Sequence, residues 1–259
     1  MKFHRLAGAT CVAGFSLALL PTHTWAVNTV NVTGTIAGSD GAPGDGVAPD
    51  FSGFIEGNAG SSGFTAPPPA DDGNTTYAVN ANITGGNGGA TNGTKPNLNY
   101  AGGAGAPALL VQTGSSVNPL VTVNGGTYTG GSGGNAAGVG TEISGGRGGD
   151  GVHVINTGTI INGGVFTGGA TGTGQNSSDI EFGGNGLFAS TNGPQLGSVT
   201  VNDGTFQGGS ASPGGLAGDG LLVIDLNVAV HGGTFTGGGA NAFGINIDGG
   251  SITLYGSNF

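Results

Sequence analysis

The chain has 259 residues, of which 62 are glycine and only 7% are charged, and its formal net charge is −10 at pH 7. A chain with four Lys and Arg residues in all excludes a basic surface for nucleic acid or for an anionic membrane. The length allows one extended domain, and the glycine content disfavours helices, because a helical Gly costs about 1 kcal/mol relative to Ala.

Residues 1–26 have the pattern of a secretory signal peptide. Lys2 and Arg5 precede an apolar run from Leu6 to Leu20, and a polar stretch ends at Ala26. The apolar run is too short to span a membrane. We therefore expect an exported protein, with an uncleaved N-terminal anchor as the alternative. Cys11, the single cysteine, lies inside this segment, so the mature chain is expected to have no disulfide and no thiolate metal site.

Residues 27–104 contain two strand-like stretches, Val30–Ile36 and Tyr77–Ile83, and each is followed by a Gly-rich segment. Between them, Phe64–Gly73 includes three consecutive prolines, a pattern typical of a surface loop or linker. We expect irregular N-terminal coils in this part of the chain.

Residues 105–259 repeat one phrase. Its copies are VTVNGGTYTGG from Val121, TIINGGVFTGG from Thr159, VTVNDGTFQGG from Val199, VAVHGGTFTGG from Val228 and an eroded ITLYGSNF from Ile252. A short apolar stretch precedes each copy, so every repeat holds three short strands. A single coil of this kind cannot bury its apolar face, whereas stacked coils bury one another's.

The repeats predict an all-β fold, a right-handed parallel β-helix (solenoid) of about seven to eight coils. We expect regular coils over residues 105–259, open at the C-terminal end. Gly130–Gly149 and Gly168–Gly184 are expected as long Gly-rich loops on one edge.

Two columns of residues recur in the aligned copies. The aromatic column is expected to form an internal stack, and its members are Tyr128, Phe166, Phe206, Phe235 and Phe259. The position four residues earlier is expected to form a hydrogen-bonded corner ladder, and its members are Asn124, Asn162, Asn202 and His231, followed by Tyr255. A ligand site in this second column is the alternative.

A calcium site is one candidate for chemistry. Gly145–His153 fits the Ca²⁺-binding nonapeptide G-G-x-G-x-D-x-U-x, and Gly214–Leu222 fits it except at Ala217. The candidate metal ligands are therefore Asp150 and Asp219. The two matches are far apart in sequence, so the alternative is that each Asp caps a loop before a strand. No other cofactor is expected.

Carbohydrate-active β-helix enzymes place several carboxylates on one face. Here the carboxylates are scattered, and Asp179 and Glu181 are the one pair that a strand would bring to the same side. We therefore expect a protein that is not an enzyme, with a lyase or hydrolase as the alternative. A Thr array that includes Thr127, Thr129, Thr234 and Thr236 leaves ice binding as a further alternative.

The phrase N-G-G-T-F-x-G-G, with G-D-G-L/V strands between its copies, resembles the Gly-rich passenger regions of Gram-negative autotransporters and related exported surface proteins. The resemblance covers residues 105–259. It implies a β-helical rod at the cell surface or in the extracellular space, used for adhesion, aggregation or matrix formation. Its partners would be a host or environmental surface, a polysaccharide or further copies of itself, with no nucleic acid and no direct membrane span. No translocator β-barrel follows the repeats, so we expect a chain cut short before its C-terminal module or a secreted rod.

Overall fold

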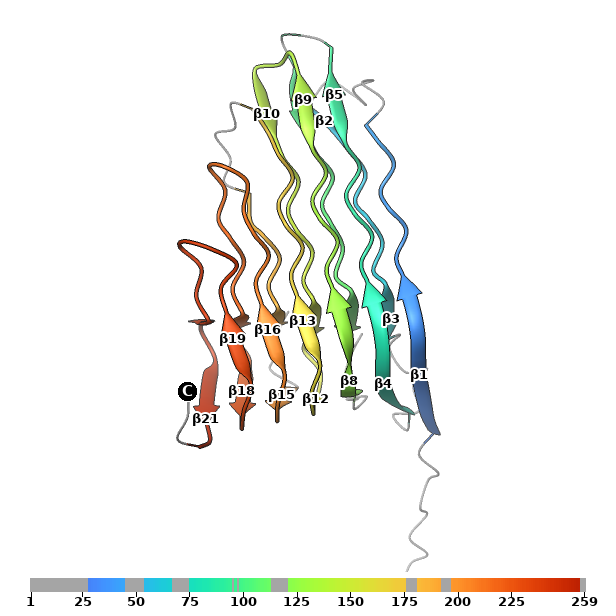
Figure 1. The fold of residues 1–259 in the computed structure, drawn as a ribbon, viewed down its shortest axis with the longest axis vertical. Coiled ribbons are helices and arrows are strands. Elements are labelled where there is room, and N and C mark those ends of the chain that lie inside the picture. The colour runs from blue at the N-terminus through green and yellow to red at the C-terminus, as the bar shows by residue number, and fades with distance from the viewer. Residues whose placement is uncertain are drawn as a thin grey trace, which may run out of the picture.

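The repeats form parallel strands that pair from one coil to the next (Figure 1). The computed structural model describes residues 28–44, 54–66, 75–94, 96, 98–112, 121–175, 181–191 and 197–256. Within these residues every regular element is a β-strand. The signal-like segment 1–26, Asp179 and Phe259 lie outside the described residues.

The largest sheet has ten strands and contains the repeated phrase. It begins with β1 (Asn28–Ala37), β4 (Thr75–Thr84) and β8 (Val121–Thr129). Beyond β8 it continues along two parallel paths, because the corner after the Val pair divides each later copy into two short strands. One path is β12 (Thr159–Ile161), β15 (Ser198–Val201), β18 (Asn227–Val230) and β21 (Ser251–Leu254). The other is β13 (Val165–Thr167), β16 (Thr205–Gln207) and β19 (Thr234–Thr236).

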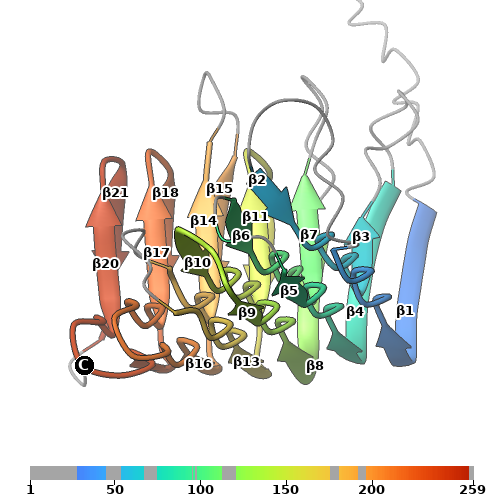
Figure 2. The ribbon, with the colours of Figure 1, turned by 90° about the horizontal axis from the view of Figure 1, so that it is seen from above.

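Three smaller sheets complete the coils. The six-stranded sheet contains β3 (Phe64–Ala66), β7 (Leu109–Gln112), β11 (Val152–Ile155), β14 (Leu187–Ser190), β17 (Leu221–Ile224) and β20 (Ile245–Asp248). The three-stranded sheet contains β2 (Phe54–Glu56), β6 (Asn99–Ala101) and β10 (Glu142–Ser144), and a final pair joins β5 (Thr91–Gly93) to β9 (Ala136–Gly138). Figure 2 shows the same stack from above.

The predicted all-β architecture of parallel strands is confirmed. Each strand of the repeat pairs in register with its counterpart in the next copy, as Val121 does with Thr159 and Thr159 with Val199. One part of the expected linker is corrected, because Phe64–Ala66 forms β3 and pairs with β7 at the edge of the six-stranded sheet. Residues 67–74 lie outside the described residues.

The core lies between the sheets and follows the two-residue alternation of the strands. Val121 and Val123 are completely buried, while Thr122 between them faces outward. Tyr128, Phe166 and Phe206 are also completely buried. Their rings stack from coil to coil, with centroids 4.9 Å apart for the first pair and 4.7 Å for the second, and Phe235 extends the stack at 4.8 Å. Burial raises the pKa of the Tyr128 hydroxyl to about 12.

The glycine-rich segments are packed into two layers, which corrects the prediction of long Gly-rich loops on one edge. The first layer contains residues 38–44, 85–91, 130–136, 168–174, 208–210 and 237–238, and the second contains residues 57–63, 102–108, 145–151, 182–186 and 216–220. Figure 1 shows these segments as wavy traces that continue from the strands. We call them the first and second glycine layers.

Hydrogen bonds within a glycine layer recur at every third residue. In the first layer, the N–H groups of Gly85 and Gly88 donate to the carbonyls of Thr129 and Ser132 over 2.9 and 2.8 Å. In the second layer, the N–H groups of Gly102 and Gly105 donate to Ser144 and Arg147 over 2.9 and 2.8 Å. This is the period of a polyproline II helix, whereas a β-strand has a period of two.

The two glycine layers bond to each other through the middle residue of each G-G-x triplet. The N–H of Gly131 donates to Ala106, that of Gly149 to Gly131 and that of Gly169 to Gly149, over 2.8, 2.8 and 2.7 Å. A Cβ atom at Gly149 would lie 2.1 Å from the Ala106 oxygen, so a side chain there would clash with the neighbouring backbone. The third residue of the triplet, such as Arg147, projects outward. Backbone hydrogen bonds therefore order the segments, and these bonds can form because the two glycine layers lie so close together.

Candidate functional site

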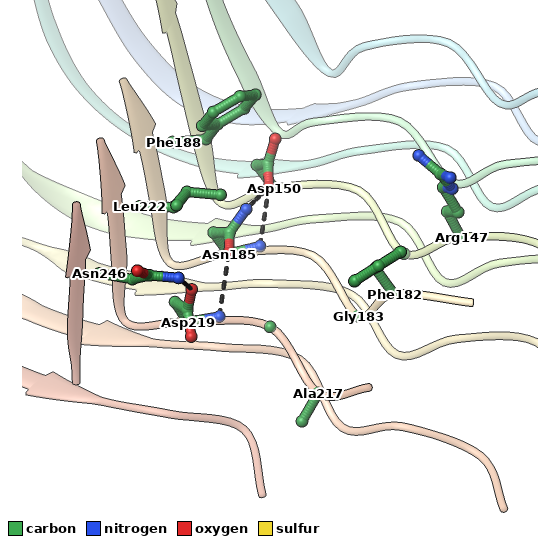
Figure 3. Close-up of a pocket in the computed structure, with 12 residues that line it drawn as sticks. Arg147, Asp150, Phe182, Gly183, Asn185, Phe188, Ala217, Asp219, Leu222 and Asn246 are labelled. Carbon is green, nitrogen blue, oxygen red and sulfur yellow. Dashed lines mark hydrogen bonds between the residues drawn. The ribbon is translucent and has the colours of Figure 1, made fainter. Parts of the chain in front are cut away.

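A groove of about 420 Å³ lies where the six-stranded sheet meets the second glycine layer (Figure 3). It crosses successive coils, from that of Arg147 to that of Asn246. Backbone of the glycine layer lines part of it, including Gly148, Gly183 and Gly218. Most of its side chains come from two positions. The third residues of G-G-x triplets supply one set, and the outward residues of the strands supply the other.

A polar row, formed by Asp150, Asn185, Asp219 and Asn246, runs along the groove (Figure 3). The backbone N–H and Nδ2 of Asn185 donate to Asp150 Oδ1 over 2.7 and 3.0 Å. The backbone N–H of Asp219 donates to Asn185 Oδ1 at 2.9 Å, and Asn246 Nδ2 donates to Asp219 Oδ2 at 2.8 Å. These bonds hold the side chains of the row in fixed positions from coil to coil.

Phe188 and Leu222 form an apolar wall on one side of the polar row (Figure 3). They are register partners in β14 and β17, and both face away from the core because Leu187 and Leu221 before them are buried. His153, the partner of Phe188 in β11, packs its ring against that of Phe188 with centroids 4.5 Å apart. His153 Nδ1 also lies 3.1 Å from Asp150 Oδ2, so it connects the apolar wall to the polar row.

Arg147 and Phe182 lie on the other side of the polar row (Figure 3). The guanidinium carbon of Arg147 is 5.3 Å from the centroid of the Phe182 ring, which gives a cation–π contact. Phe182 is 42% exposed. Beyond this pair lies a smaller hollow of about 190 Å³, which Arg147, Glu56 and Glu181 line together. Arg147 therefore stands between two hollows.

The structure does not bring the predicted calcium ligands together. Asp150 and Asp219 lie two coils apart in the polar row with Asn185 between them, a separation of about 10 Å at the usual strand spacing. Ca²⁺ binds oxygen at roughly 2.3–2.6 Å, so one ion cannot reach both carboxylates. Over the part of the chain that the structure describes, no three His, Cys, Asp or Glu side chains are grouped to hold a metal ion.

The corner residues lie one above another. Asn162 Nδ2 donates to Asn124 Oδ1 at 2.9 Å, and Asn202 Nδ2 donates to Asn162 Oδ1 at 2.8 Å. His231 stacks on Tyr255, with ring centroids 4.3 Å apart and an interplanar angle of 7°. The second Gly of each corner has a positive φ, which explains why Asp can replace only the first, and these glycines are Gly126, Gly164, Gly204 and Gly233.

The outward Thr residues form interrupted rows on the ten-stranded sheet. Thr127, Thr205 and Thr234 share one register position, but Val165 stands between the first two. In the second row Gln207 separates Thr167 from Thr236. The face is therefore not a continuous Thr array.

Comparisons of the chain with protein-family models, curated proteins and solved structures gave no match. Among the described residues, no helix is long and apolar enough to cross a membrane.

The calcium motif in the sequence points to Asp150 and Asp219, but it does not predict that they share a groove with Arg147, Phe188 and Leu222. These residues lie outside the repeated phrase. The sequence signal that marks Arg147, Asp150 and Asn185 is the G-G-x triplet. In Gly145-Gly-Arg-Gly-Gly-Asp150 and Gly183-Gly-Asn185, the third residues lie on the same outward side.

Proposed function

We propose that the protein is an exported, non-enzymatic structural protein of a Gram-negative cell surface or of the extracellular space, with an adhesive or matrix-forming role. Its coils would follow the right-handed parallel β-helix of the autotransporter passenger regions that the repeats resemble, with about seven to eight coils. Its partners would be an environmental or host surface, a polysaccharide or further copies of the protein.

One observation carries this proposal: the long Gly-rich segments are themselves packed structural layers. Gly131, Gly149 and Gly169 bond layer to layer through the backbone. Such segments give a stiff body with regular outward rows and little chain free to rearrange around a substrate. This arrangement suits a protein that presents a surface.

A carbohydrate-active enzyme is the second candidate, because the smaller hollow places Glu56 and Glu181 beside Arg147. Two carboxylates near an Arg are the groups that glycoside hydrolysis or lyase chemistry needs. A Ca²⁺-stabilised secreted module is the third reading, with the separate carboxylates Asp150 and Asp219 as its ligands.

The test uses the full chain expressed with its own leader in a Gram-negative host. We expect antibody to label the protein outside the cell, and we expect surfaces coated with it to retain more cells than uncoated surfaces. Purified protein should release no reducing ends and no unsaturated sugars from acidic or neutral polysaccharides. If the protein releases such sugar products and Glu181→Gln does not, the proposal is wrong and the protein is a carbohydrate-active enzyme. Melting that shifts on adding a chelator would favour the calcium reading.

A further inference from the structure

We propose that the groove binds a neutral, hydroxyl-rich polysaccharide strand lying along the stack of coils. This inference rests on the proposed function of a surface-binding protein and names the ligand class of its groove. Four features of the groove carry it: its direction, its balance of charge, its aromatic side chains and its fixed polar groups.

The direction of the groove favours a linear polymer. It crosses the coils of Asp150, Asn185 and Asp219, which repeat one above another at about 4.8 Å. A small molecule would occupy one or two coils and leave the rest of the row empty. A chain of similar units running along the stack would meet comparable groups at each step.

The charges along the groove favour a neutral ligand. Asp150 and Asp219 supply two carboxylates and Arg147 supplies a cation, all facing the same space. A polyanion would be repelled by the carboxylates and a polycation by the guanidinium. Hydroxyl groups suit both, since they donate to a carboxylate and accept from a guanidinium.

The aromatic side chains favour sugar rings. Phe182 and Phe188 lie on opposite sides of the polar row, and each has part of its surface open to the groove. A pyranose ring has C–H groups on its faces and hydroxyls at its rim. It can therefore cover a Phe ring while its rim reaches the Asp and Asn side chains, the usual combination of apolar lining and a few placed polar groups.

The polar groups are held in place before any ligand arrives. The row is fixed by its own bonds, such as Asn246 Nδ2 to Asp219 Oδ2 at 2.8 Å. The Arg147 guanidinium lies over the Phe182 ring, and Arg147 makes no side-chain hydrogen bond or ion pair among the described residues, so its N–H donors can serve a ligand. Groups that are already ordered lose little conformational entropy on binding.

The test is affinity electrophoresis of the full chain through native gels that contain one polysaccharide each. The neutral probes are xyloglucan, galactomannan, mixed-linkage β-glucan and dextran, and the acidic probes are polygalacturonate and alginate. We expect at least one neutral probe to retard the protein. Arg147→Ala and Phe188→Ala should each weaken that binding by about tenfold or more, as loss of a central contact does.

The variants have internal controls. Arg147→Ala should fold, because Ala104 already occupies the same outward row one coil earlier, where Gly105 bonds to the Arg147 carbonyl. Tyr255→Ala removes an exposed aromatic ring that is not part of the groove and should leave retardation unchanged.

Three results would overturn the inference: no retardation by any neutral probe, retardation by the acidic probes alone, or retardation that neither groove variant changes. If cell retention persists without retardation, the inference fails and the adhesive function stands. If a neutral probe is bound and also cleaved, the groove assignment stands and the non-enzymatic function fails.

Discussion

At the scale of single residues, the inward positions of the repeated phrase hold apolar side chains, with the exception of one Thr. Thr159 lies in register between Val121 and Val199 and is completely buried. Its Oγ1 has no hydrogen-bond partner among the described residues. A buried hydroxyl without a partner costs roughly 1–3 kcal/mol. Thr159 therefore stabilises its coil less than the Val at the same position in the neighbouring coils does.

Thr159→Val should therefore stabilise the protein, by about 1–2 kcal/mol in the free energy of unfolding. The replacement has nearly the same shape and restores the residue that stands at Val121, Val199 and Val228. Guanidinium denaturation followed by circular dichroism measures the change. Thr122→Val is the matched control, because Thr122 faces outward, and its effect should stay within about 0.5 kcal/mol. A Thr159→Val protein no more stable than the wild type would contradict the unpaired hydroxyl.

At the scale of elements, the molecule combines two periods. The strands repeat every two residues, which places Val121 and Val123 in the core. The hydrogen bonds of the glycine layers repeat every three residues. The packing of these layers requires residues without a side chain, whereas the packing of the strands requires apolar side chains. Strands and glycine-layer segments follow one another along the chain, so each coil is held by side-chain packing in its strands and by backbone packing in its Gly-rich segments.

Gly149→Ala should destabilise the protein strongly, because the new Cβ would lie 2.1 Å from the Ala106 oxygen and 2.3 Å from its carbon. Both atoms belong to backbone in the neighbouring segment and cannot move aside without breaking layer bonds. We expect a loss of about 1–3 kcal/mol or more, the cost of overpacking. The midpoint of thermal unfolding measures it.

Gly158→Ala is the control for that substitution, since no atom lies within 4 Å of a Cβ placed there. Its stability should be unchanged or slightly higher, because Ala restricts the unfolded chain. Equal effects of the two substitutions would show that the glycine layers tolerate side chains, against the close packing described above.

The sequence predicted one kind of element and missed the other for a physical reason. The alternation of apolar and polar residues in the repeated phrase indicates strands with Val121 and Val123 on one face, because side chains report which face is inside. The glycine layers leave no side-chain pattern except the third residue of each triplet, so the sequence alone predicts Gly-rich loops there. The groove was missed for the same reason: Arg147 and Asp150 stand at third positions, and their alignment requires the three-residue period.

At the scale of the whole molecule, strands and glycine layers form one hydrogen-bonded network across the coils (Figures 1 and 2). Each coil is bonded to the coils beside it, and the two layers are also bonded across. A repeat structure of this kind draws its stability from contacts between neighbours. The groove is formed by several coils together, so its shape depends on the continuity of the network.

Hydrogen exchange can test whether the hydrogen-bonded amides of the glycine layers follow a three-residue period. In a G-G-x triplet the two Gly N–H groups are bonded, as in Gly102 and Gly103 or Gly168 and Gly169. The N–H of the third residue, at Ala104 and Ala170, has no partner among the described residues. NMR after transfer to D₂O should therefore show two slow amides and one fast amide in these two triplets, with the slow ones as protected as Val123 in β8. The third amide should also be slow where a side chain accepts from it, as Asn87 Oδ1 does from the N–H of Ser132. Loops would exchange fast at all three positions, and a β-strand at the edge of a sheet would alternate every second residue. A three-residue pattern is expected only if the glycine layers form as described, and its absence would leave the groove without the backbone that shapes it.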